Sequence, residues 1–204
     1  NCAYEQGDSG AGNRDDLSLP VSMEVAQALF RTLVYRAPDV AEHCRRVSNY
    51  CELVAADRLG ERTRRILAIV AHLHSIERMR LPDELLKKTA PLSQSERQQI
   101  AMHDRCGFEL LRITFGCQEL DQLLSEFIQE RAPALPKPSK SIVQAAKILR
   151  VVDRFDSLTY RHRERIQSDE QALQILALEA GRTLDEAIAT AFIQAMNSSP
   201  QSGE

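Results

Sequence analysis

Three histidines and one aspartate lie on apolar stripes of separate predicted helices. His43, His74 and His103 each have apolar residues three, four or seven positions away, which is the spacing of one helix face. Asp153 follows the apolar Leu149 by four positions within the run AAKILRVVDRFDSL. A buried carboxylate needs a hydrogen bond, an ion pair or a metal, because an isolated buried charge is too costly. Imidazole and carboxylate together suit zinc, iron, manganese or nickel, so convergence of the four would form a metal site.

The spacing of these residues also fits a simpler interpretation. A single histidine on an apolar face is usually a core or boundary residue, and periodicity alone does not bring four helices together. We expect His72 and His162 to lie at the surface without a special role. The basic run RHRER, residues 161–165, is typical of a solvated helix end.

The elements that must position the four residues are helices, since no alternating strand pattern occurs. Capping boxes at Ser93 with Glu96, at Ser168 and at Thr183 mark helix starts, and Pro38 suits a first turn. The expected helices cover about 22–36, 38–60, 61–78, 82–88, 93–115, 117–131 and 141–166, followed by one helix after each of the last two boxes. We therefore predict an all-α protein, a single bundle of about seven to nine helices around one core.

Composition sets further bounds on the protein. The chain has 204 residues, 43% of them hydrophobic and 27% charged, with a net charge of −3. This favours one globular domain over 17–197, with disordered tails at 1–16 and 198–204, and gives no indication of binding to a nucleic-acid polymer. No apolar run reaches membrane-spanning length. Five cysteines without a CxxC pair predict buried free thiols in a reducing cytoplasm.

Four sequence blocks, in order, carry a resemblance to a known family. They are HCRRVSNYCELVA from His43, HSIERMRLPDELLKKTAPLSQSE from His74, MHDRCGFELL around His103, and VVDRFDSLT around Asp153. Together they resemble the HD-GYP family, a branch of the HD-domain metal-dependent phosphohydrolases, over about residues 17–197. The resemblance implies an HD-domain fold and a cluster of two or three metals, usually iron or manganese. In the family a metal-activated water attacks a phosphodiester of cyclic di-GMP.

The chain departs from the family pattern at its chemically important positions. Ser75 replaces the aspartate of the HD pair, which bridges two metals in the family. The following Gly-Lys is Glu77-Arg78, and Arg78 is the candidate phosphate-binding residue. Ile128 and Gln129 occupy the places of two metal-binding histidines. The segment IQERAPALP also lacks the glycines and the tyrosine of the GYP loop.

The resemblance therefore implies a reduced site. His43, His74, His103 and Asp153 remain as metal ligands for either no ion or one weakly held divalent transition metal, which would be iron, manganese or zinc. A two-metal site clamps the attacking and leaving oxygens together, and a single ion does not. We assign no catalytic residue.

Three functions are consistent with this sequence. The preferred one is a catalytically impaired HD-GYP-like domain that serves as a signalling or interaction module in bacterial cyclic-dinucleotide pathways. The first alternative is a phosphohydrolase, for cyclic di-GMP or a related phosphate ester, with a single-metal site. The second is a nucleotide sensor that binds without hydrolysis. The preferred function implies a protein partner, leaves cyclic di-GMP open as a ligand, and is compatible with a homodimer.

Overall fold

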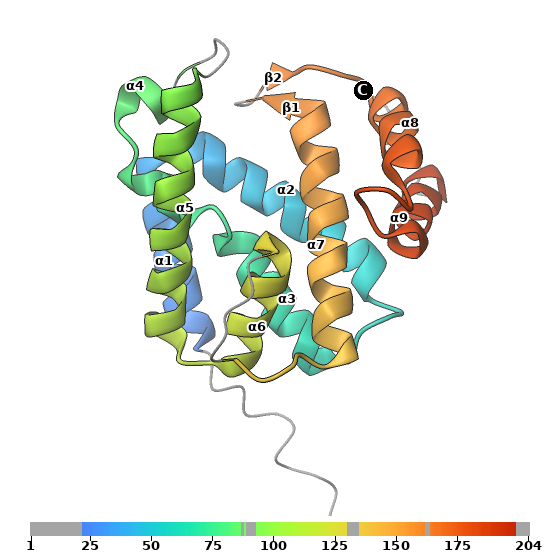
Figure 1. The fold of residues 1–204 in the computed structure, drawn as a ribbon, viewed down its shortest axis with the longest axis horizontal. Coiled ribbons are helices and arrows are strands. Elements are labelled where there is room, and N and C mark those ends of the chain that lie inside the picture. Colours follow the sequence, from blue (N-terminus) through green and yellow to red (C-terminus); the bar gives the residue numbers. More distant parts are fainter. Residues whose placement is uncertain (1–21, 87, 89–92, 130–134, 162–163, 199–204) are drawn as a thin grey trace, which may run out of the picture.

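The structure is a computed structural model that describes residues 22–86, 88, 93–129, 135–161 and 164–198. It confirms the all-α prediction. The helices and strands are α1 Met23–Arg36, α2 Pro38–Ala55, α3 Glu61–Leu73, the 3₁₀ helix η2 Ile76–Arg80, α4 Asp83–Leu86, α5 Gln94–Phe115, α6 Gln118–Ile128, α7 Lys140–Thr159, β1 Tyr160–Arg161, β2 Glu164–Arg165, α8 Asp169–Glu179 and α9 Glu186–Ser198 (Figure 1). The predicted tail 1–16 and residues 199–204 lie outside the described residues.

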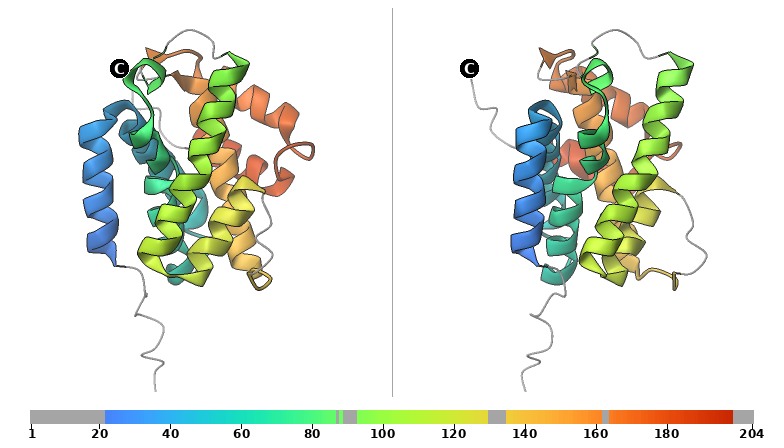
Figure 2. Two further views of the ribbon diagram at one scale, coloured as in Figure 1. Left: turned by 60° about the vertical axis from the view of Figure 1, so that its left-hand side comes forward. Right: turned by 90° about the vertical axis from the view of Figure 1, so that its left-hand side faces the viewer.

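Helix α7 is the central element of the fold. It packs against α2, α3, α6, α8 and α9, and the two side views show it inside the bundle (Figure 2). Its Phe155 is fully buried and meets Phe192 of α9 edge-on, with ring centroids 5.0 Å apart. Within the described residues, no helix has both the length and the apolar character needed to span a membrane.

Local sequence signals place several helix ends correctly. Pro38 stands at the first turn of α2, where its missing N–H removes no helical hydrogen bond. The capping boxes at Ser93 and Ser168 are both present, with the side chains of Glu96 and Gln171 reaching back to the cap. The predicted box at Thr183 is wrong in register. Helix α9 begins at Glu186, and Ile188 N donates to Asp185 Oδ1 at 3.1 Å.

Three expected helices end at least five residues before their predicted ends. The second ends at Ala55, well before position 60, and the third ends at Leu73, where η2 takes over. The long helix ends at Thr159 rather than near 166. There the Thr159 hydroxyl donates to the carbonyls of Phe155 and Asp156 at 3.0 and 3.2 Å, and the chain turns into a short antiparallel hairpin, β1–β2.

The prediction of buried free thiols is confirmed for the described cysteine side chains. Cys44, Cys51 and Cys117 are buried free thiols. Burial raises the pKa of Cys51 far above its ordinary value, because the apolar core disfavours a thiolate. This thiol acts as a core residue.

Candidate metal centre

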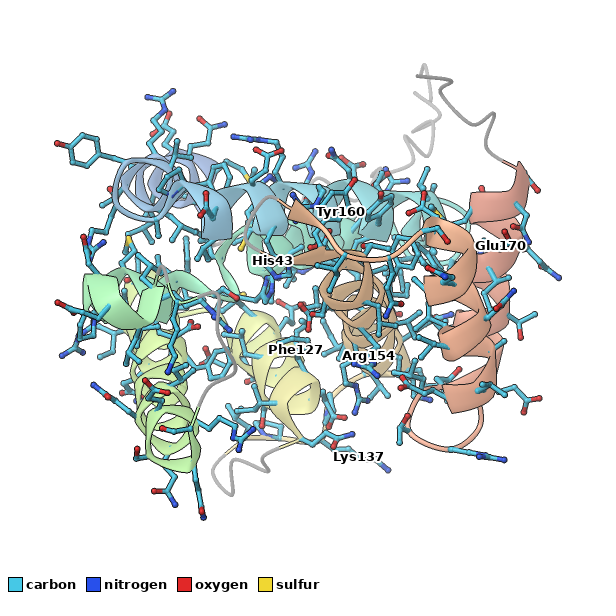
Figure 3. The ribbon with its side chains drawn as sticks, turned by 90° about the horizontal axis from the view of Figure 1, so that it is seen from above. His43, Phe127, Lys137, Arg154, Tyr160 and Glu170 are labelled. Carbon is cyan, nitrogen blue, oxygen red and sulfur yellow. The ribbon has the colours of Figure 1, made fainter. Side chains whose placement is uncertain are left out.

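Three helices bring the predicted ligands to one place. His43 lies in the second turn of α2, His74 is the C-cap residue of α3, and Asp153 lies on α7. Figure 3 shows His43 pointing from α2 toward α6 and α7. The break after α3 matters here, because a continuous helix would carry the residues beyond His74 along the α3 axis instead of turning them into η2.

The ligand atoms of these three residues form a compact triangle. His43 Nε2 and His74 Nε2 are 3.1 Å apart. Asp153 Oδ1 lies 3.3 Å from His43 Nε2 and 3.4 Å from His74 Nε2. His74 is buried, whereas the side chain of Asp153 is 31% exposed and that of His43 is 22% exposed. One side of the triangle therefore reaches solvent.

The other ring nitrogens fix which atoms face the triangle. His43 Nδ1 lies 2.7 Å from Asp156 Oδ2, and His74 Nδ1 lies 2.8 Å from the carbonyl oxygen of Ala71. Both partners only accept hydrogen bonds, so both Nδ1 atoms carry the proton. In the neutral rings the two Nε2 lone pairs then point at one another and at a carboxylate. Three electron-rich atoms in contact require a proton or a cation between them.

The pKa shifts at the site also indicate that it favours a positive charge. Burial lowers the pKa of His43, but hydrogen bonds to Asp153 and Asp156 outweigh it and raise the pKa to about 8. Burial also lowers the pKa of His74, and the neighbouring Cys44 sulfur and Asp153 carboxylate raise it well above 6.5. Burial raises the pKa of Asp153, yet hydrogen bonds from the two imidazoles hold it far below its ordinary value. The site attracts positive charge.

The triangle fits a divalent transition metal. With bonds of about 2.0–2.1 Å, ligands of a tetrahedral ion lie about 3.3 Å apart. The three measured separations, 3.1, 3.3 and 3.4 Å, match that value. Two imidazoles and one carboxylate with an open side are also the donor set of many catalytic zinc sites.

Cys44 adjoins the site, and its thiolate would bind soft metals. Ligand atoms of His43, Cys44 and His74 all lie within 4.8 Å of one another. However, the Cys44 sulfur contacts Nδ1 of His74, at 3.9 Å, and not the Nε2 atom that faces His43. Asp153 Oδ1 lies 3.3 and 3.4 Å from the two Nε2 atoms, so we place Asp153 in the ligand set and Cys44 beside it.

The other predicted site residues lie at several distinct places. Arg78, on η2, has a 43% exposed side chain and an ion pair with Glu77, with Nε 3.8 Å from Oε1. Ser75 is buried directly after His74 and does not cap η2 with its side chain. Ile128 ends α6 half-buried, and Gln129 is its exposed, left-handed C-cap at φ 58°. His103 falls within α5, and its side chain lies outside the described part of the structure.

Glu77 stands where the family has glycine and is buried against α5. A methyl group added at Gly107 would lie 2.6 Å from Glu77 Cβ and 2.8 Å from Oε2. These distances are too short for real side chains, so the glycine in MHDRCGFELL allows η2 to approach α5. Gly107 therefore has a packing role in this chain.

Two residues of the site were not assigned a role in it from the sequence. Asp156 is buried next to His43, and Arg46 binds its carboxylate with Nε and Nη2, at 2.6 and 2.9 Å. Asp156 follows Asp153 by three residues, and Arg46 follows His43 by three, so each shares a helix face with a ligand. That spacing was the available signal. Phe127 also packs on His74, with ring centroids 5.7 Å apart.

Comparison with known proteins supports the resemblance. No family model matches this chain. The cyclic di-GMP phosphodiesterase response regulator RpfG of Xanthomonas campestris pv. campestris (strain 8004) is 28% identical over 181 residues, covering 84% of this chain and 47% of RpfG. The chain thus spans about half the length of the curated relative that it matches. The similarity supports an HD-domain family for this chain.

Proposed function

We propose that this chain is a catalytically impaired HD-GYP-like domain that acts as a signalling or interaction module in bacterial cyclic-dinucleotide pathways. The similarity to RpfG, a cyclic di-GMP phosphodiesterase response regulator, supports the pathway. The triangle of His43, His74 and Asp153 supports binding of one divalent ion. The small number of carboxylates at the site supports the loss of phosphodiesterase activity.

The proposal rests on the small number of carboxylate oxygens that face the two imidazoles. Among the described residues, one carboxylate, Asp153, lies within 3.4 Å of the two Nε2 atoms. Asp156 does not substitute for the missing aspartate at Ser75, because Arg46 and His43 bind both of its oxygens. A neutral hydroxyl at position 75 cannot bridge two cations.

The size of the repulsion shows why this matters. Two divalent ions about 3.5–4 Å apart, the spacing of two-metal sites, repel by about 18 kcal/mol at an effective dielectric constant of 20. Anionic ligands must offset that energy. Asp153 contributes one negative charge, and the charge of Asp156 is already matched by Arg46. The site therefore suits one ion and lacks the clamp on both reacting oxygens.

The setting of the domain is part of the same proposal. Buried free thiols at Cys44, Cys51 and Cys117 suit a reducing cytoplasm. We propose that a signalling protein is the partner, and that a homodimer is compatible with its role. Cyclic di-GMP is the ligand to test, and calorimetric titration separates a nucleotide sensor from a module that binds only proteins.

Elemental analysis and a hydrolysis assay test the proposal together. Protein purified without chelators should contain no more than one transition-metal ion per chain and should leave cyclic di-GMP intact. The variant His74→Ala should lose the ion. Two ions per chain, or cyclic di-GMP hydrolysis that His74→Ala abolishes, would overturn the proposal.

A single-metal phosphohydrolase is the second candidate, and the exposure of the site favours it. The Asp153 side chain is 31% exposed, so an ion on the triangle would be open to water and to a phosphate ester. Loaded with manganese, iron or zinc, the protein should then hydrolyse bis(p-nitrophenyl) phosphate, and Asp153→Asn should not. No hydrolysis with any of the three metals would eliminate this candidate.

A further inference from the structure

We infer that Asp156 is a positioning residue for the metal centre, and that Arg46 holds its carboxylate in place so that Nε2 of His43 faces the ion. The inference rests on the proposed metal site and deepens it. Neither residue has a role in the ligand triangle itself.

Asp156 is the most deeply buried carboxylate in the described part of the chain, at 1% exposure. A buried charge must be compensated, and here each oxygen has a charged or polar partner. Oδ1 accepts from Arg46 Nε at 2.6 Å. Oδ2 accepts from Arg46 Nη2 at 2.9 Å and from His43 Nδ1 at 2.7 Å. The paired contact with the planar guanidinium fixes the carboxylate plane.

Arg46 is itself held from the other side. Its guanidinium carbon lies 4.1 Å from the centroid of the Tyr160 ring, within the range of a cation–π contact. Tyr160 follows Thr159, whose hydroxyl donates to the Asp156 carbonyl at 3.2 Å. The end of α7 thus fixes Asp156 through its backbone and through Arg46. Such a carboxylate has little freedom to turn toward another donor.

The fixed carboxylate determines the state of His43. An acceptor at Nδ1 selects the tautomer with the proton on that atom, and it also sets the plane of the ring. The remaining lone pair, on Nε2, then points at His74 and Asp153, at 3.1 and 3.3 Å. The opposite tautomer would place a proton where the metal binds. Partners of this kind change metal affinity about 10–100-fold.

The two imidazoles differ in how they are held. His74 donates from Nδ1 to a backbone carbonyl, that of Ala71, which no side-chain substitution removes. His43 depends on the side chain of Asp156. Substitution of Asp156 therefore tests the positioning of one ligand while the other remains in place.

The experiment measures affinity for Zn²⁺ alone in Asp156→Asn by competition with a chelating dye. The amide keeps the side-chain shape but offers one acceptor oxygen where Arg46 and His43 present three N–H groups, so we expect affinity to fall about 10–100-fold. Glu119→Gln is the matched control. Arg62 Nε and Nη2 bind Glu119 at 2.9 and 2.8 Å, and this paired contact involves no ligand of the triangle. The Zn²⁺ affinity of Glu119→Gln should equal that of the wild type.

A second measurement reads the positioning without metal. In ¹⁵N NMR spectra of the metal-free wild type, recorded about two pH units above the His43 pKa of about 8, the ring should carry its proton on Nδ1. A proton on Nε2 would overturn the inference, and so would Zn²⁺ affinity in Asp156→Asn within twofold of the wild type. If Asp156→Asn does not fold, Arg46→Lys replaces it and should show a smaller loss in the same direction, and unchanged affinity there counts equally against us.

If the proposed metal site does not exist, the two experiments give a different pattern of results. In that case the wild type itself binds no Zn²⁺, while the NMR spectrum still reports the tautomer of His43. The two conclusions are therefore tested separately.

Discussion

The metal-free protein should lose stability as the pH rises through neutrality, because His43 binds its proton more tightly in the folded state. Its pKa rises from 6.5 to about 8 on folding. A folded-state pKa above the unfolded one stabilises the fold fully below about pH 6.5, and the contribution disappears as the pH passes about 8. Asp153, whose pKa is lowered, stays ionised throughout this range and adds no slope.

The magnitude follows from the two pKa values of His43. Linkage gives about 1.9 kcal/mol at about pH 6 and about 0.4 kcal/mol at about pH 8. The expected loss is therefore about 1.5 kcal/mol, or a shift of about 0.5–1 M in the urea midpoint. The raised pKa of His74 acts in the same direction, so this figure is a lower bound on the expected loss of stability.

Urea unfolding of chelator-treated protein, followed by circular dichroism between about pH 6 and pH 8, measures this loss. The variant His43→Gln removes one titrating group and should reduce the slope by the share of His43, about 1.5 kcal/mol over this range. Metal should reverse the trend, because the imidazoles must be deprotonated to bind it, so the stabilisation by Zn²⁺ should increase over the same range. If the metal-free wild type is equally stable at both ends of this pH range, or more stable at the higher pH, the electrostatic account of the site is refuted.

Three further predictions concern packing and ligation. Gly107→Ala should lower the free energy of unfolding in urea by about 1–3 kcal/mol. In the double variant with Glu77→Gly, more than half of this loss should be restored, because the 2.6 Å contact disappears. Strictly additive effects of the two substitutions would contradict this contact. Gly60→Ala, which meets no atom within 4 Å, is the control and should cost less than about 1 kcal/mol. Zn²⁺ at about 100 times its dissociation constant should stabilise the wild type by about 2.7 kcal/mol in thermal unfolding, and Asp153→Asn should lose this gain. Phe155→Ala should cost about 3–5 kcal/mol, and a loss below about 1 kcal/mol would be inconsistent with its place in the core.

Features encoded over a few residues were predictable from the sequence. Pro38, Ser93 and Ser168 mark helix starts because their effects act within one turn. The helical periodicity around His43 and Asp153 indicated inward-facing side chains for the same reason. The structure places these two residues 3.3 Å apart. Periodicity alone did not show that their helices meet, and the family motifs supplied that expectation.

Features that depend on contacts between helices were not predictable in the same way. Arg46 and Asp156 are 110 residues apart in the chain, so their pairing becomes visible only when α2 and α7 pack together. The early end of α3 at Leu73 has a similar cause. The apolar pattern continues past it, but η2 packs against α5 at Gly107 instead of extending the helix. Local propensity is overridden at such places.

The position of α7 has a consequence for how the domain would transmit occupancy of its site. The helix that carries Asp153 also packs against five other helices, so an ion held there would be coupled to the cooperative unfolding of the whole domain. No hinge or lid is needed for a distant surface to respond. Under the proposed function, binding of the ion would change the rigidity of the surface that a partner protein contacts, which is the mechanism of dynamic allostery.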